Sequence, residues 1–399
     1  MKHDEPPGVE WHPEPAAAEL PTEPDLDWSS SEATVPIAPI LAGAVDRYPP
    51  ACAQCGGQLG VDGYCLTCGA KAKTLREHYE LTPADWVAGV CDIGQAHARN
   101  EDAIDCQASP DRAVLVVSDG VTTSQGSDVA AMVAARTACD YLWTEPPAGL
   151  GTLQSRTAAM RAQLVAAVAR ANSAVVTTTD PLSRNAAAAT VAIAVVTGQR
   201  IYAANLGDSR VYWLPDDGAP AQLTKDHSLA QAGIDMGSGR AEAEASPFAH
   251  TITKWLGADA TDLSPNLADL TVTVPGWLIV CSDGLWNYIS EASAFQARVV
   301  ACGATTPAEL AGALVGWAND QGGHDNISVV CARLDPLAAP ATPADDVTAT
   351  DEAQTQAGTV SADSGPAAGS ADDTAPGPAE PTEPGPADAG FQPADGPTS

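Results

Sequence analysis

Two short apolar runs constrain the fold of this chain more than any other feature of its sequence. The first reads VLVVSDG at residues 114–120, and the second reads LIVCSDG at residues 278–284. Runs of mostly β-branched residues that end abruptly are typical of strands buried on both faces. We therefore expect two buried strands that present Asp119 and Asp283 at the mouth of the core. A carboxylate in such a position loses part of its solvation and needs a positive partner.

Several other runs have the pattern of a strand or a helix. The strand-like runs are 86–92, 113–118, 190–197, 200–206, 210–215, 271–274, 277–282 and 327–334, and the helical patterns occupy about 127–144, 153–178 and 306–320. Turn signals such as Thr-Gly-Gln and Gly-Asp-Ser separate several of the strands, which indicates antiparallel hairpins. Because the strands do not alternate with helices, two packed sheets flanked by helices are favoured over an alternating parallel sheet.

Both ends of the 399-residue chain have the composition of disordered segments. Residues 1–50 are rich in Pro, Ala and acidic residues, and residues 336–399 hold eleven acidic residues without a Lys or Arg. Such segments bury too little apolar surface to offset the entropy of ordering the chain. They carry −8 and −11 of the formal net charge of −32, which leaves −13 on the middle of the chain. This charge argues against nucleic acid or an anionic membrane as a partner.

The sequence also bears on the compartment. It has no run of eighteen apolar residues that would predict a transmembrane helix, and its start, MKHDEPPGVEW, lacks the basic end and apolar core of a signal peptide. We therefore expect a cytoplasmic protein. In that compartment the ten cysteines are reduced thiols or metal ligands rather than disulfides.

Four of the cysteines are close together in the segment 51–70. Cys52, Cys55, Cys65 and Cys68 form two C-x2-C pairs nine residues apart, and a glycine follows each pair. Four thiolates in a tetrahedron are typical of a structural zinc site. The alternatives are four unrelated buried cysteines or a redox pair, and zinc is favoured because twenty residues have no core of their own. A closed four-cysteine site keeps no position for water, so it carries no chemistry, and the few basic residues nearby give nucleic-acid binding little support.

Further acidic residues lie beside the strand-like runs. RNEDAID contains Glu101 and Asp102, NLGDSRVYW contains Asp208, and GGHDNISVV contains Asp325 just before a strand. Taken singly, Asp208 is typical of a hairpin turn and Asp102 of a cap or turn. Together with the two Ser-Asp-Gly strands, they indicate a site for hard divalent cations such as Mg²⁺ or Mn²⁺.

The ordered motifs resemble a known family. RNEDA, VVSDG, NLGDSRVY, LTKDHS, AHTITKWLG, CSDGLW and GGHDNISVVCARL are similar to the motifs of the metal-dependent protein serine/threonine phosphatases of type 2C (PPM) in their bacterial form. The resemblance covers essentially all of residues 83–335. It implies an α+β fold, an αββα sandwich of two antiparallel sheets between helix pairs, preceded here by the zinc ribbon and a linker at 71–82. Residues 224–255 would form a mobile flap over the site.

The resemblance implies three catalytic aspartates that hold two Mn²⁺ or Mg²⁺ ions. Asp119 would bridge the two ions, and the carbonyl group of Gly120 would bind one of them. Asp283 and Asp325 would hold the other.

The resemblance also implies supporting roles around these ligands. Glu101 and Asp102 would act through metal-bound waters, and Asp208 matches a family residue tied to a third, weaker metal ion. Asn326 would support the ligand shell beside Asp325.

The implied reaction is hydrolysis of phosphoserine and phosphothreonine esters by in-line attack of a hydroxide that bridges the two ions. The expected partners are phosphorylated proteins, among them Ser/Thr kinases and their substrates, and the expected state is a monomer. One alternative is a catalytically weak or inactive binding module that regulates kinase signalling. Another is a zinc-ribbon adaptor in which the phosphatase domain serves as regulator. Because all three catalytic aspartates are present, an active enzyme is favoured.

One position departs from the family pattern. The family has an arginine five residues before the aspartate of the Asn-Glu-Asp motif, where it binds the substrate phosphate through two hydrogen bonds. Here that position is His97. Arg99 lies two residues further on and faces the same side in an extended chain. We expect Arg99, with or without protonated His97, to bind the phosphate. The alternatives are a weakened affinity for phosphate and a His97 without a role. The family's proposed general-acid histidine is also absent, and His227 is a weak candidate to replace it.

Overall fold

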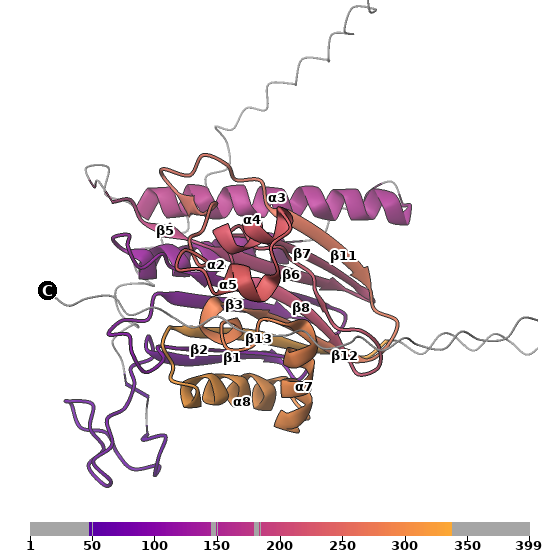
Figure 1. The fold of residues 1–399 in the computed structure, drawn as a ribbon. Coiled ribbons are helices and arrows are strands. Elements are labelled where there is room, and N and C mark those ends of the chain that lie inside the picture. The colour runs from indigo at the N-terminus through magenta and orange to yellow at the C-terminus, as the bar shows by residue number, and fades with distance from the viewer. Residues whose placement is uncertain are drawn as a thin grey trace, which may run out of the picture. The chain divides into compact units, whose positions relative to one another are not determined.

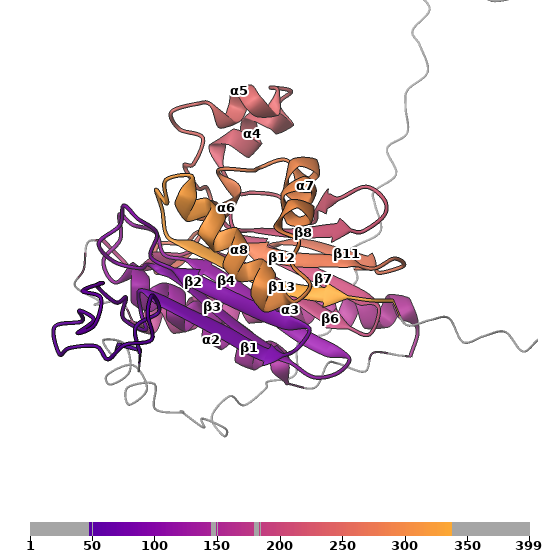
Figure 2. The same ribbon diagram turned by 90° about the horizontal axis from the view of Figure 1, so that it is seen from below.

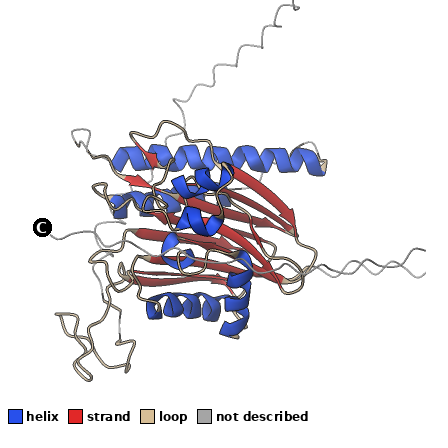
Figure 3. Ribbon diagram, in the orientation of Figure 1, coloured by secondary structure: helices blue, strands red, loops and turns tan. Residues whose placement is uncertain are grey.

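The computed structural model describes residues 48–49, 51–144, 149, 151–178, 183 and 185–336. Within these residues two antiparallel sheets lie face to face, and helices cover both outer faces (Figures 1 and 3). The expected αββα sandwich is confirmed. Apart from residues 48, 49 and 336, the two segments expected to be disordered lie outside the described residues.

The first sheet has six strands in the order β1-β2-β13-β12-β8-β9. These strands are β1 (His78–Ala84), β2 (Val87–Asp92), β13 (Ile327–Leu334), β12 (Gly276–Cys281), β8 (Arg210–Pro215) and β9 (Ala221–Gln222). Its outer face packs on the helices α6 (Asp283–Trp286), α7 (Ala292–Cys302) and α8 (Pro307–Asp320).

The second sheet has five strands in the order β11-β7-β6-β4-β3. These strands are β11 (Asn266–Thr271), β7 (Arg200–Leu206), β6 (Val191–Thr197), β4 (Arg112–Asp119) and β3 (Asp102–Ala108). Its outer face packs on α2 (Ser127–Trp143) and α3 (Leu153–Thr178). Two further short strands, β5 (Ala188–Ala189) and β10 (Leu256–Gly257), form a separate antiparallel pair.

Three hydrophobic clusters hold the four layers together. One lies between the sheets and contains Leu115 and Val117 of β4 with Leu278 and Val280 of β12, all fully buried. The other two lie between each sheet and its helices. Because both faces of β4 and β12 are covered, these strands are apolar without alternation, and the prediction of two doubly buried strands is confirmed.

Local signals account for several helix ends. At the start of α8, the side chain of Thr306 accepts a hydrogen bond from the Glu309 amide while Glu309 bonds back to Thr306, and Pro307 occupies the first turn. This reciprocal capping satisfies backbone donors that the helix leaves free. The preceding helix α7 ends at Cys302, and Gly303 after it has a φ of 63°, the left-handed conformation common after a helix.

Three strands differ from the sequence-based expectation. β1 begins at His78, inside the segment 71–82 that was expected to be a linker. β3 was not expected as a strand because DAIDCQA alternates apolar with acidic or amide residues. The strand expected at 271–274 is observed instead at Asn266–Thr271. Its last paired residues are Thr271 and Arg200, and the Val272 amide then donates to the Gln199 carbonyl oxygen at 2.8 Å.

The segment 224–255 contains two short helices, α4 (Leu229–Asp235) and α5 (Arg240–Glu244). Figure 2 shows them standing apart from the two sheets, on the side where α6 lies. Among the described residues, no single helix reaches the length and hydropathy needed to cross a bilayer. α7 and α8 reach that threshold only jointly, with a bend of 112° between them.

Candidate active site and four-cysteine cluster

The two Ser-Asp-Gly runs end at the same place in the sandwich. β4 ends at Asp119, and Asp283 follows β12 as the first residue of α6. Although the strands belong to different sheets, the two carboxyl groups interact directly. This meeting point explains why two distant segments share one sequence pattern.

The glycine after each aspartate is required by close backbone contacts. A Cβ atom on Gly120 would lie 2.5 Å from the carbonyl oxygen of Ser127 and 2.6 Å from that of Glu101. A Cβ atom on Gly284 would lie 2.0 Å from the Asn326 carbonyl oxygen. The described residues donate no hydrogen bond to the Gly120 carbonyl oxygen, which is the group expected to bind a metal ion.

Asp102 is brought to the same site by strand pairing. It lies directly opposite Asp119 in the β3–β4 register and is 1% exposed. The Ser282 hydroxyl donates to its carboxylate at 2.7 Å. Asp102 is therefore the first residue of strand β3, and the alternative of a cap or turn does not describe it. Ser282 belongs to the Ser-Asp-Gly motif, but no local pattern predicts its contact with Asp102.

The carboxyl groups of the site raise one another's pKa. Burial, opposed by the Ser282 hydrogen bond and reinforced by Asp325 and Asp283, raises the pKa of Asp102 to about 8. Burial and the charge of Asp325 raise the pKa of Asp283 to about 6. The pKa of Asp119 lies well above its usual range because of burial and then the charges of neighbouring carboxylates, Asp102 first. Among the described residues that contribute most to these shifts, only His250, which acts on Asp283, is a basic group that opposes the rise. A divalent cation would supply the missing positive charge.

Asp208 lies in the turn between β7 and β8, as expected, and is 4% exposed. Burial and the charge of Asp283 hold its pKa well above the usual range. The Trp286 indole donates to its carbonyl oxygen at 3.0 Å, which fixes the turn against α6. The turn thus belongs to the same acidic cluster.

The Asn326 side chain binds the loop at 93–101 at three points. Its side-chain oxygen accepts the Glu101 amide at 2.7 Å, and its side-chain nitrogen donates to the carbonyl oxygens of Ile93 at 2.8 Å and Arg99 at 3.2 Å. Asn326 follows Asp325 directly, so it fixes the distance between this aspartate and the loop at 93–101.

The two basic residues of that loop lie at the edge of the cluster. The His97 ring nitrogen Nε2 is 3.1 Å from the Asp325 carboxylate. The Arg99 guanidinium binds Glu101, lies 3.8 Å from Asp128, and is 52% exposed. Glu101 also accepts the hydroxyl of Ser127, the first residue of α2. One side of Arg99 therefore faces solvent beside the carboxylates.

His227 does not fit the role of a proton donor. Burial, assisted by the charge of Lys254, lowers its pKa to about 4. Its ring accepts the Gly207 amide at 3.2 Å and contacts Asn266 at 3.2 Å. It fixes the turn that carries Asp208 and remains neutral at pH 7.

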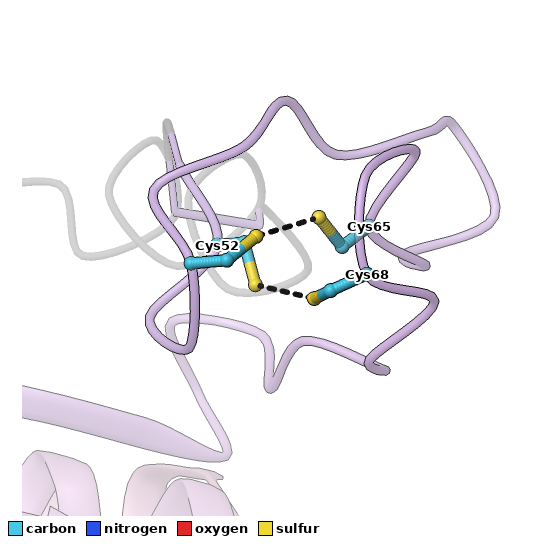
Figure 4. Close-up of side chains that lie close together, drawn as sticks. Cys52, Cys65 and Cys68 are labelled. Atoms are coloured by element: carbon cyan, nitrogen blue, oxygen red, sulfur yellow. Dashed lines mark hydrogen bonds between the residues drawn. The ribbon is translucent and has the colours of Figure 1, made fainter.

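The four cysteines of the ribbon converge as the sequence predicts (Figure 4). All four sulfur atoms lie within 4.8 Å of one another. Cys52 and Cys68 are 3.7 Å apart, and Cys55 and Cys65 are 3.4 Å apart. A tetrahedral ion with bonds of about 2.3 Å places its sulfur ligands about 3.8 Å apart. The backbone amides of Cys68 and Thr67 lower the pKa of Cys65 to about 6, which favours the thiolate. This cluster is able to hold a metal ion.

Comparisons with known proteins agree with this geometry. The sequence profile described as protein phosphatase 2C matches residues 94–315. The serine/threonine phosphatase stp of Listeria innocua is 28% identical over 242 residues, which are 60% of this chain and 92% of that protein. Protein phosphatase PhpP of Streptococcus pneumoniae is 32% identical over 143 residues, which are 36% of this chain and 56% of that protein. The crystal structure of the Mycobacterium tuberculosis serine/threonine phosphatase PstP/Ppp superposes with a TM-score of 0.52 at 28% identity and covers 62% of this chain and 98% of that one.

Proposed function

The chain belongs to the protein phosphatase 2C family and is a serine/threonine protein phosphatase, and from this premise we propose that its acidic cluster is a metal-dependent catalytic centre. Asp119, Asp283 and Asp325 would hold two Mn²⁺ or Mg²⁺ ions together with the Gly120 carbonyl group. The observation that carries the proposal is that the fold brings Asp119, Asp102 and Asp283 together, where burial first and the charges of neighbouring carboxyl groups second raise their pKa.

The surrounding residues would shape this centre. Asp102 and Glu101 would contact the ions through water, and Asp208 would hold a third, weaker ion. When bound, such ions neutralise a phosphate ester and lower the pKa of a water molecule, so that it becomes a nucleophile at neutral pH. Asn326 would keep Glu101 and Asp325 at a fixed separation.

Arg99 is the proposed phosphate ligand. Its guanidinium has an exposed side next to the carboxylates, and a guanidinium matches the geometry of a phosphate oxygen pair. Without substrate it is held by Glu101 and Asp128. His97, on Asp325, would assist it when protonated. Arg99→Ala should raise the Michaelis constant for a phosphopeptide by about tenfold or more, whereas an unchanged constant would exclude this role.

We propose zinc as the ion of the four-cysteine cluster, because four thiolates at these distances suit it. The phosphatase would act on phosphorylated proteins such as Ser/Thr kinases and their substrates, and the ribbon would bind a partner. Zinc binding and partner binding by the ribbon are both compatible with the proposed arrangement of the catalytic carboxylates.

Hydrolysis of a phosphothreonine peptide tests the proposed function. The purified full-length protein is assayed with Mn²⁺, with Mg²⁺ and with EDTA, and Asp119→Asn is assayed in parallel. We expect turnover that requires the metal ion and is lost in the variant. Folded, metal-loaded protein without turnover would contradict the proposal and favour a binding module with a phosphatase fold.

A further inference from the structure

Residues Lys73–His78, which begin three positions after the four-cysteine ribbon at 51–70, bind both ends of the loop that carries the basic residues of the proposed active site. We call these six residues the clasp and residues 93–101 the catalytic loop. The loop runs from the end of β2 to the start of β3. It contains His97, Arg99 and Glu101.

The clasp binds the first end of the loop through Asp92, whose side chain is 4% exposed. The Lys73 ammonium group lies 2.8 Å and 2.6 Å from the two carboxylate oxygens, and the His78 ring nitrogen Nδ1 lies 2.7 Å from one of them. The Asp92 carboxylate in turn accepts the Gly94 amide at 2.8 Å. The Ile93 amide donates to the Glu77 carbonyl oxygen at 2.8 Å. The start of the loop is therefore tied to both ends of the clasp.

The clasp binds the second end of the loop through Arg76. Its guanidinium donates to the carbonyl oxygen of Asp102 at 2.7 Å and to that of Asp128 at 3.3 Å. The Asn100 side chain donates back to the Arg76 carbonyl oxygen at 3.1 Å. Arg76 thus joins the start of β3 to the start of α2.

A shift of the loop would be transmitted to the metal-binding residues. Gly94 has a φ of 77°, and a Cβ atom there would lie 2.2 Å from the Asp325 carbonyl oxygen. The other end continues into Glu101 and Asp102. Misplacement by about 1 Å costs on the order of a hundredfold in enzyme rate, so contacts that fix this loop bear on catalysis.

We propose that Lys73 and Arg76 are positioning residues of the active site, which act by holding the catalytic loop at both ends; this role rests on the proposed function. Neither residue belongs to the segment 94–315 that matches the family profile. Ala72, the residue directly before the clasp, is bound to the ribbon, because its amide donates to the Gly63 carbonyl oxygen at 2.8 Å. The four-cysteine cluster is therefore connected to the catalytic loop through a short bonded segment.

The test uses Arg76→Gln, Lys73→Met and Lys73→Arg in the full-length protein. The kinetic constants for a phosphothreonine peptide and the Mn²⁺ concentration for half-maximal activity are measured for each. We expect Arg76→Gln to raise both the Michaelis constant and the half-maximal Mn²⁺ concentration on the order of tenfold. Lys73→Met should also raise both quantities. In Lys73→Arg both should stay close to the wild-type values, because the positive charge on Asp92 is kept. Arg161→Gln is the matched control, since it breaks an arginine–aspartate pair with Asp269 at 2.5 Å on the surface of α3.

Hydrogen exchange of the loop amides provides a readout that does not require turnover. In Arg76→Gln the amides of Gly94, Glu101 and Asp102 should exchange faster, while those of β4 and β12 stay protected. Wild-type kinetic constants together with wild-type exchange in residues 93–102 would overturn the proposal. Faster exchange throughout both sheets would also overturn it, because the effect would then be on global stability. If the wild-type protein shows no turnover, the proposed function fails and exchange alone decides whether the clasp holds the loop.

Discussion

At the scale of single residues, two buried aspartates whose pKa values shift in opposite directions support the proposed metal site. Burial acts to raise the pKa of Asp92, but hydrogen bonds from His78 and Lys73 hold it below its usual range. Asp102 is equally buried and faces hydroxyl groups and other carboxylates, and its pKa rises to about 8. Asp92 is a structural carboxylate with its cations in place, whereas Asp102 belongs to a cluster that needs cations from outside the chain.

The contacts of Asn326 predict a joint loss of stability and metal affinity. Asn326→Ala leaves the Glu101 amide and two carbonyl oxygens without their partner. We expect the free energy of unfolding to fall by about 2 to 4 kcal/mol and the half-maximal Mn²⁺ concentration to rise. Denaturant unfolding and metal titration of activity measure the two effects. Asn172→Ala, which removes a single bond to Gly257 at 2.8 Å, should destabilise less and leave the metal titration unchanged.

His227 predicts a pH dependence of stability. Its pKa is about 4 in the folded protein, against an ordinary value of 6.5. Between these values the unfolded chain binds the proton and the folded protein does not, so this contribution is lost as the pH falls from 6.5 to 4. The loss approaches about 1.4 kcal/mol per pH unit. In His227→Asn, which keeps an acceptor for the Gly207 amide, the slope of unfolding free energy over this range should be shallower; an identical slope would show that His227 is not its source.

At the scale of helices and strands, the sequence predicted elements whose cause is local. The β4 and β12 runs are apolar throughout because both faces are buried, and α8 carries its own capping residues. β1 and β3 were missed because their half-polar sequences become strands only through pairing with β2 and β4. The contacts of Arg76 with the start of β3 join residues that are far apart in the sequence. No local sequence pattern predicts them.

Gly120 and Gly126 lie between β4 and α2, and we expect their substitution by alanine to affect activity differently. Gly120→Ala places a methyl group 2.5 Å and 2.6 Å from two backbone oxygens that cannot move independently. We expect the free energy of unfolding to fall by about 3 kcal/mol. Activity should also be lost, because Asp119 must shift. Gly126 has a φ of 74° and open space around a Cβ atom, so Gly126→Ala should cost about 1 kcal/mol and keep activity. Thermal unfolding and turnover of both variants check this, and equal effects on activity would contradict the close approach at Gly120.

At the scale of the whole molecule, the ribbon and the sandwich are stabilised differently. The three hydrophobic clusters among the described residues contain no residue of the ribbon. Val61 and Leu66 of the ribbon are exposed. We therefore expect the fold of the ribbon to depend on the proposed metal ion, as is common for small domains without a core.

Loss of the ribbon metal should leave the sandwich folded. The double variant Cys52→Ser/Cys65→Ser is expected to lose the one bound zinc ion per chain while the main thermal transition remains. Elemental analysis and calorimetry measure these two quantities. Collapse of the main transition would mean that the ribbon stabilises the sandwich beyond the contacts of the clasp.

The most direct test of the metal-dependent centre is calorimetric titration of Mn²⁺ into chelator-treated protein at pH 7. The buried carboxyl groups predict tight binding accompanied by proton release, because Asp102, with a pKa of about 8, is mostly protonated before the ion arrives. Repeating the titration in buffers of different ionisation enthalpy counts the released protons, and Asp119→Asn should lose the tight sites. A wild-type protein that binds no Mn²⁺, or a variant that binds it with the same stoichiometry and proton release, would contradict the assignment of the acidic cluster as the catalytic centre.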